Sequence, residues 1–97
     1  MKAEIRKAEI LTAAVEVASR YGYMNMRRED IAKLAGCATG SVNNYYGTMS
    51  QLRRAVMREA IHTNNYTVIA QGLAHKDRCA LKAPPEVKQA VIESILG

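Results

Sequence analysis

The chain has 97 residues, 48% of them hydrophobic, which amounts to one small domain or one domain with a tail. Its formal net charge of +5, from 14 basic and 9 acidic residues, suits a polyanionic partner, although solubility alone would explain it. The N-terminus lacks an apolar signal core, and no apolar run approaches the ~20 residues that cross a bilayer, so we expect a cytoplasmic chain without membrane association. Cys37 and Cys79 form no CxxC pair, and we expect both thiols to be reduced.

Two helices are expected in the first third of the chain. Residues 4–21 carry apolar side chains at three- and four-residue spacing, which predicts an amphipathic helix that Gly22 stops. A second helix is expected over residues 27–35, followed by a break at Gly36. Its inward-facing side chains are predicted to be Ile31, Leu34 and Ala35.

Two more helices follow in the middle of the chain. A third is predicted over Thr39–Tyr45 and ends at Gly47. Thr48 and Gln51 then have the spacing of a capping box, which predicts the start of a fourth helix. We expect this helix to run from about Met49 to at least Ile61, and the apolar pattern allows continuation through Val68, Ile69 and Leu73.

The helical pattern fails around residues 74–85, where Pro84 and Pro85 forbid a continuous helix. A last helix is predicted over residues 86–96. No segment has the alternating pattern of a strand, so the predicted fold class is all-α.

The segment from Ile31 to Tyr46 has the layout of a helix-turn-helix, which places its second helix in the major groove of DNA. Ala32 is small where the two helices cross, and Gly36, four residues later, permits the positive φ of the turn. Val42, six residues beyond Gly36, fills the space between the helices. This spacing alone is a weak signal, but here it coincides with predicted helix boundaries and a basic flank.

An inward Val42 determines which residues of the third helix face solvent. Tyr45 and Tyr46 start on the same side as Val42, and Ser41 lies near the edge. The outward residues are then Thr39, Gly40, Asn43 and Asn44. Asparagine can bond adenine through two hydrogen bonds, Ser and Thr can bond bases or phosphates, and Gly40 lets the helix backbone approach DNA closely. The alternative interpretation is that these are ordinary solvated residues of a short helix.

From Ile10 to Val56 the chain resembles the N-terminal DNA-binding domain of TetR-family regulators. The matching segments are Ile10-Leu11-x-Ala13-Ala14, Tyr21-Gly22-Tyr23, Asp30-Ile31-Ala32, Ala35-Gly36, Gly40-Ser41-Val42, Tyr45-Tyr46 and Leu52. The resemblance implies a small helical bundle with a TetR-like helix-turn-helix and, here, one or two extra C-terminal helices. It also implies base contacts from the helix around Thr39–Tyr45 and phosphate contacts from Arg27, Arg28 and the Thr48 region. The predicted DNA-binding set is therefore Arg27, Arg28, Thr39, Gly40, Ser41, Asn43, Asn44, Tyr45 and Thr48.

The chain also departs from the family pattern. The family usually has an aromatic residue at the position of Asn43 and often a Lys at that of Met49, so base preference is not transferable. Both of these family residues help to bind the DNA backbone. Arg27 and Arg28, which stand where the family more often has Thr or Ser and an apolar residue, can offset the loss of these backbone contacts. The helical effector-binding domain of the family has no room in residues 63–97, so we expect no small-molecule ligand.

Other polar residues give weaker signals. Arg53, Arg54 and Arg58 lie on the fourth helix and can either meet phosphates or form a solvated face near the DNA. His75 and Cys79 are too few ligands for a structural zinc site, so no metal is expected. No nucleophile–base grouping, paired acids or phosphate-binding glycine loop occurs, so we expect neither an enzyme nor a cofactor.

The C-terminal segment is predicted to join two copies of the chain. We divide the chain into a DNA-binding domain, residues 1–62, and a short helical tail, residues 63–97. The residues assigned to dimerisation are Val68, Ile69, Leu73, Val87, Val91 and Ile95. The alternative is that the last helix folds back over the core of its own chain.

These patterns predict a dimeric, sequence-specific DNA-binding transcription regulator, more readily a repressor, on a palindromic operator of double-stranded DNA. Such a minimal regulator would suit a plasmid or a phage, with control from its own concentration or a partner protein. One alternative is an accessory or architectural DNA-binding protein that recruits a partner through residues 63–97. Another is a protein-interaction module that keeps the fold without binding DNA.

Overall fold

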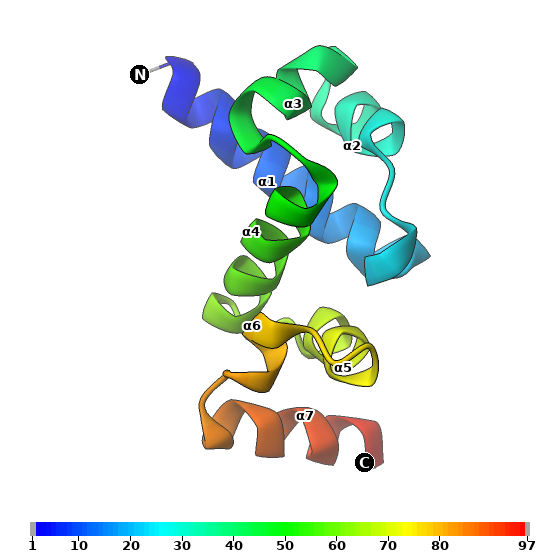
Figure 1. Cartoon of the computed structure of the whole chain (residues 1–97), viewed down its shortest axis with the longest axis vertical. Helices are drawn as coiled ribbons and strands as arrows, with labels where there is room; N and C mark the ends of the chain where they lie inside the picture. The colour runs from blue at the N-terminus through cyan, green and yellow to red at the C-terminus, as the bar shows by residue number, and fades with distance from the viewer. Residues whose placement is uncertain (1, 97) are drawn as a thin grey trace.

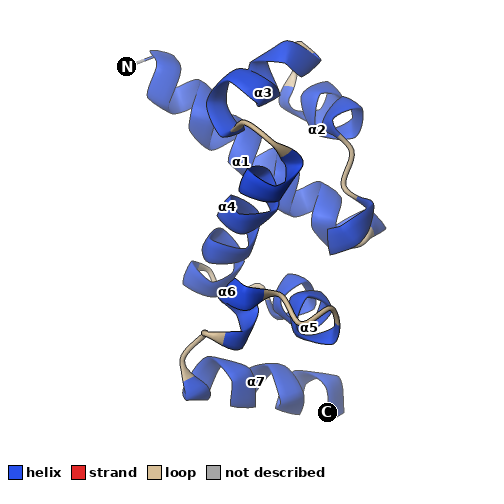
Figure 2. Cartoon of the chain, viewed as in Figure 1, coloured by secondary structure: helices blue, strands red, loops and turns tan. Residues whose placement is uncertain are grey.

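The structure is a computed structural model that describes residues 2–96. Within these residues all regular structure is helical, which confirms the predicted all-α class (Figure 2). In chain order the elements are α1 (Lys2–Tyr21), the 3₁₀ turn η1 (Tyr23–Asn25), α2 (Arg28–Ala35), α3 (Thr39–Tyr46), α4 (Met49–His62), α5 (Tyr66–Ala74), α6 (Arg78–Leu81) and α7 (Pro85–Leu96).

The ends of the first four helices follow local backbone chemistry. Gly36 ends α2 in the left-handed region, with φ 73°, and the N–H of Cys37 donates to the carbonyl of Ala32 at 3.0 Å. The predicted capping box of α4 is confirmed: Thr48 Oγ1 accepts the N–H of Gln51 at 3.2 Å, and the Gln51 amide oxygen accepts the N–H of Thr48 at 2.8 Å. These signals confirm the turn of the helix-turn-helix and the start of α4.

The suggested continuation of α4 through Leu73 is wrong. The helix ends at His62, and Asn64 takes the left-handed conformation with φ 57°. The Asn65 side chain then caps α5 by accepting the N–H of Val68 at 3.2 Å. Asparagine tolerates this conformation better than most residues, which explains why the chain turns here.

The segment around residues 74–85 contains one helical turn that the sequence pattern did not predict. Asp77 caps this turn, α6, by accepting the N–H of Ala80 at 3.0 Å. Within residues 2–96, three helices therefore follow α4 in place of the expected one or two.

The helices form an elongated molecule of 38 × 25 × 21 Å. In Figure 1, α2 and α3 lie with α1 at one end of the molecule. Helix α4 crosses α1 and runs away from α3 toward α5 and α6, and α7 lies at the opposite end. The N-terminal end of α4 and the whole of α3 are thus placed at the end of the molecule farthest from α7.

One hydrophobic core joins α1–α4 to α5–α7. Ile10, Leu52 and Met57 pack in the same cluster as Ile69 and Val91, all of them at most 1% exposed. The side chains on either side of the predicted 62/63 division therefore share buried contacts. The expectation that Leu34 faces inward is wrong, because its side chain is 50% exposed. The short helix α2 buries Ile31 and Ala32 instead.

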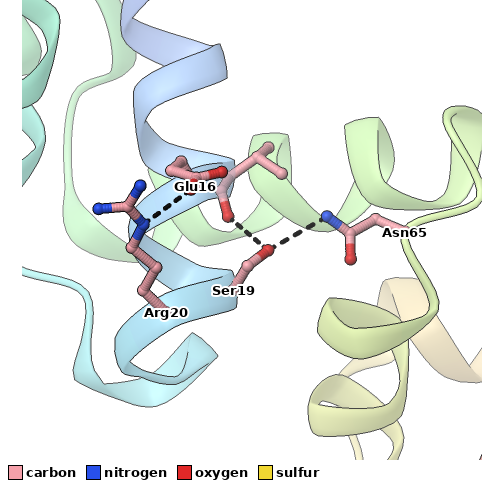
Figure 3. Close-up of polar contacts among 5 residues, drawn as sticks. Glu16, Ser19, Arg20 and Asn65 are labelled. Carbon is pink, nitrogen blue, oxygen red and sulfur yellow. Dashed lines mark hydrogen bonds and ion pairs between the residues drawn. The ribbon is translucent and has the colours of Figure 1, made fainter.

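Hydrogen bonds also connect α1 to the loop before α5. Figure 3 shows Asn65, whose Nδ2 donates to Ser19 Oγ at 3.2 Å, while the Ser19 hydroxyl donates to the carbonyl of Val15 at 3.0 Å. Beside them Arg20 Nε pairs with Glu16 Oε1 at 2.7 Å on the exposed face of α1. Ser19 thus links the long first helix to the beginning of the C-terminal helices.

Tyr23 in η1 forms a second polar connection. Its hydroxyl lies 2.9 Å from the Asp77 carboxylate and 3.0 Å from the Arg53 carbonyl. Its backbone N–H donates to the side chain of Gln71. Burial, reinforced by Asp77, raises the pKa of Tyr23 well above its ordinary value, so the hydroxyl stays protonated. This one side chain links η1 to α4 and to the N-cap of α6.

Candidate nucleic-acid interface

Helix α3 is held in place by the residues that face the protein. Val42 is 1% exposed and packs in the core, as its spacing from Gly36 predicted. The hydroxyl of Tyr46 donates to the carbonyl of Lys7 at 2.9 Å, and the Lys7 ammonium lies 5.5 Å from the centre of the Tyr46 ring. Burial raises the pKa of Tyr46, which keeps the donor protonated. Helix α3 is thus fixed against α1.

The opposite face of α3 is free of protein contacts that would restrict access to it. Thr39, Gly40, Asn43 and Asn44 are all exposed. A Cβ built on Gly40 would meet no atom within 4 Å, so packing inside the chain does not require glycine at this position. The geometry therefore presents two amide side chains, one hydroxyl and an accessible stretch of backbone to an external molecule.

Ser41 and Tyr45 lie at the edge of this face. Both are half-buried and line a shallow depression together with Ile5, Arg6 and Glu9 of α1. They are less accessible than Asn43 and Asn44. Thr48 is exposed, and although its oxygen caps α4, its hydroxyl proton remains able to donate to another acceptor.

The beginnings of α2 and α3 lack side-chain caps. Neither Arg27 nor Ala38, the N-cap residues, accepts a hydrogen bond from the helix with its side chain. Uncapped N-terminal amides are donors suited to phosphate oxygens. Arg27 is exposed and Arg28 half-buried, so two guanidinium groups flank the start of α2. The Arg27–Glu29 pair, at 3.8 Å and largely exposed, is weak enough to exchange for an anion.

The residues predicted for dimerisation divide into two groups. Val68, Ile69 and Val91 are completely buried in the core of a single chain, and Leu73 and Val87 are half-buried against it. Ile95 is 67% exposed on the outer side of α7, next to Leu96 at 81% and near Ile92 at 47%. The structure thus supports the alternative that the inner face of α7 folds onto its own chain, and it leaves an apolar outer face.

A second basic surface was not identified from the sequence. Arg54 and Arg58 of α4, for which phosphate contact and a solvated face were the two alternatives, adjoin Arg78 of α6 and its C-cap residue Lys82, and all four are exposed. Spacing along α4 identifies the first pair, but the approach of α6 depends on the turn at Asn64, which sequence periodicity did not locate. Among the described residues, no group of three or more His, Cys, Asp or Glu side chains could hold a metal ion. No described helix is both long and apolar enough to cross a bilayer.

The fold and this surface define a helix-turn-helix domain with helix α3 in the position of a recognition helix. The family described as "Bacterial regulatory proteins, tetR family" matches residues 10–56. Residues 10–56 therefore form a domain of that family, as the resemblance of Ile10–Val56 indicated.

Two curated relatives support the same assignment. They are the proteins named HTH-type transcriptional regulator BetI from Vibrio campbellii and from Vibrio parahaemolyticus, each 34% identical over 65 residues. The match covers 67% of this chain and 33% of each relative, so the chain spans only a third of their length. No solved structure matches the chain significantly.

Proposed function

We propose that the protein is a sequence-specific DNA-binding transcription regulator, a repressor, that inserts α3 into the major groove of a palindromic operator as a dimer. The observation that carries this proposal is the outer face of α3, where Asn43, Asn44 and Thr39 are exposed around Gly40. Val42 and Tyr46 hold the other face of the helix against the protein. Rigid support behind an exposed polar helix face favours readout of base edges.

The test of base readout is selection of a preferred duplex from a random pool, followed by titration of Asn43→Ala and Asn44→Ala. Each substitution is expected to cost about 1–3 kcal/mol on the selected site and to relax selectivity at one base pair. Alanine favours helix more than asparagine does, so a binding loss cannot come from unfolding of α3. Gln89→Ala, which removes an exposed amide from α7, is the matched control. Unchanged selectivity in both Asn variants would remove α3 from the interface.

Arg27 and Arg28 are proposed to bind phosphates. Replacing either with Gln is expected to weaken binding to all duplexes alike and to lower the slope of log K against log salt by about 1. A preferred sequence without palindromic symmetry would argue against a two-fold dimer. Binding with a steep salt dependence and no preferred sequence would instead support the accessory or architectural alternative.

The outer face of α7 is the proposed dimer contact. Ile92, Ile95 and Leu96 expose apolar surface that a second copy would bury. Ile95→Asp is expected to yield monomers in sedimentation equilibrium without loss of helicity, because Ile95 is 67% exposed in the single chain. Ile5→Asp, at a residue 60% exposed on α1, is the control that should leave the dimer intact. A wild-type monomer at high concentration would refute this part of the proposal.

The proposal includes no small-molecule effector. The space between α5, α7 and the helices α1 and α4 is filled by side chains such as Val68, Ile69 and Val91, all 0% exposed. This filled core supports control through protein concentration or a protein partner. Thermal shift measurements with small-molecule libraries test this point, and a stabilising ligand that also releases DNA would refute it.

A further inference from the structure

A basic groove lies between α4 and α6. It consists of two adjoining depressions, of about 270 and 480 Å³, that share Arg54, Arg78 and Cys79. Six basic side chains line it: Arg53, Arg54 and Arg58 of α4, His75, Arg78 of α6, and Lys82, which follows α6 directly. Within the described residues none of the six side chains has an ion pair or a side-chain hydrogen bond. Asp77 is the acidic lining residue, and it is engaged with Tyr23 and the N-terminus of α6.

The groove begins at Ser50, two residues from Thr48, but the part of it lined by Arg58 and Lys82 is separated from the proposed DNA surface. Arg58 lies ten residues beyond Thr48 along α4, which places it about 15 Å farther from the start of the helix. Figure 1 shows α6 against the part of α4 that is remote from α3. A duplex lying on α3 and the beginning of α4 is therefore directed away from Arg58 and Lys82.

The shape and lining of the groove restrict its occupant. Its lining residues on α4 run from Ser50 to Ile61, about 16 Å, which matches roughly five residues of an extended peptide. Ile61, Ala83 and Pro84 add an apolar strip at one end. Of the rings that line it, Tyr23 is 2% exposed and His75 is exposed, so the groove offers no row of rings on which successive bases of a single-stranded nucleic acid could stack.

We infer that this groove binds an extended acidic segment of a partner protein, with carboxylates spaced along the basic side chains and an apolar residue on the strip formed by Ile61, Ala83 and Pro84. The inference goes beyond DNA binding by naming a surface through which a second protein can dock. Unpaired cations at several points along one line favour a linear polyanion, because no single compact anion can reach all of them. All of these basic residues except the half-buried Arg53 are exposed, which implies fast, salt-sensitive association.

The test uses the full chain without DNA, so its result is independent of the proposed function. The probe is a fluorescein-labelled octapeptide of glutamate with leucine at its third and sixth positions, titrated by anisotropy at low salt. The same peptide with glutamine in place of glutamate, and an eight-nucleotide oligothymidylate, are titrated beside it. We expect the acidic peptide to bind, the glutamine peptide to fail, and added salt to release the complex.

Two double variants locate the site. Arg58→Gln with Lys82→Gln is expected to weaken peptide binding about five- to tenfold. Arg20→Gln with Lys33→Gln removes the same charge from exposed positions outside the groove and is expected to change it less than about twofold. Equal losses in both variants, no peptide binding, or tighter binding of the oligothymidylate would overturn the inference. So would a loss of operator affinity and salt slope in the Arg58/Lys82 variant, since the groove would then belong to the DNA surface.

Discussion

Gly40→Ala is expected to stabilise the protein and to weaken its binding to DNA. Gly40 lies in the first turn of α3 with no positive φ, and a Cβ at this position meets no atom within 4 Å. Alanine therefore fits without strain and restricts the unfolded chain, which is expected to add about 0.4–1 kcal/mol to the free energy of unfolding. For a domain of this size the melting temperature should rise by roughly 2–8 °C.

The same methyl group projects from the exposed face that we propose to contact DNA. It should keep the α3 backbone from approaching the duplex and cost about 1–3 kcal/mol of binding, comparable to one lost base contact. This corresponds to a dissociation constant that is roughly five- to 150-fold larger. Thermal melting by circular dichroism and titration of the selected duplex measure the two effects on the same preparation.

Gly36→Ala is the control that separates backbone strain from space. A Cβ on Gly36 also meets no atom within 4 Å, but its φ of 73° is unfavourable for alanine. This substitution should destabilise the protein by about 1–2 kcal/mol. A more stable Gly40→Ala variant with unchanged DNA affinity would refute close approach at this residue. A less stable Gly40→Ala variant would refute the description of α3 as an unstrained, uncovered helix.

Three further substitutions test the connections inside the fold. Tyr23→Phe should lower the free energy of unfolding by about 1–3 kcal/mol at neutral pH and reduce its decline above about pH 10. The decline arises because burial raises the pKa of Tyr23 in the folded state, so the stability that its protonated hydroxyl contributes is complete below the unfolded pKa and is lost as pH rises beyond that value. Urea unfolding at pH 8 and 11 measures the loss of unfolding free energy, and an equal loss in wild type and Tyr23→Phe would contradict this reasoning. Asn65→Ala should cost about 0.5–2 kcal/mol in chemical denaturation and more than Ser19→Ala, because only Asn65 also caps α5; equal losses would deny the cap its role. Gly72→Ala should cost about 1–3 kcal/mol, since its Cβ would overlap the methyl group of the completely buried Met57 and lie 3.1 Å from the Cβ of Ala80; a stability equal to wild type would show that both neighbours adjust freely.

The helix boundaries of the helix-turn-helix, from α2 to the start of α4, could be predicted from the sequence because they depend on local residues. Gly36, Gly47 and the Thr48–Gln51 box determine where α2 and α3 end and α4 begins, each through hydrogen bonds within a few residues. The proposed base-contact residues were placed on α3 by the same logic, with Val42 as the reference point, whereas Arg27, Arg28 and Thr48 were assigned from the family resemblance. Their chemistry toward DNA stays a prediction.

Periodicity gave less information about α2 and the C-terminal helices. Leu34 fits an inward stripe, yet an eight-residue helix buries only part of that stripe, and its neighbours leave Leu34 half exposed. The two asparagines at the turn, Asn64 and Asn65, are of a type that commonly breaks and caps helices, but the apolar pattern of Val68 and Ile69 alone does not reveal this turn. Contacts such as Tyr23 to Gln71 join residues 48 positions apart, and no local pattern specifies such pairings.

The shared core gives the C-terminal helices a role in DNA recognition within the proposed function. Val91 of α7 packs in the same core as Ile10 of α1, and α1 holds α3 through Tyr46, so a continuous set of contacts connects the two ends of the molecule. Contact between two α7 helices would therefore determine the distance and angle between the two α3 helices. Half-sites one helical turn of DNA apart require about 34 Å between recognition helices, whereas each chain is 38 Å long, so two chains joined through α7 would have to be inclined toward each other rather than placed end to end. Position and rotation of the α7 contact would thus select the half-site spacing, while the outer face of α3 selects the bases.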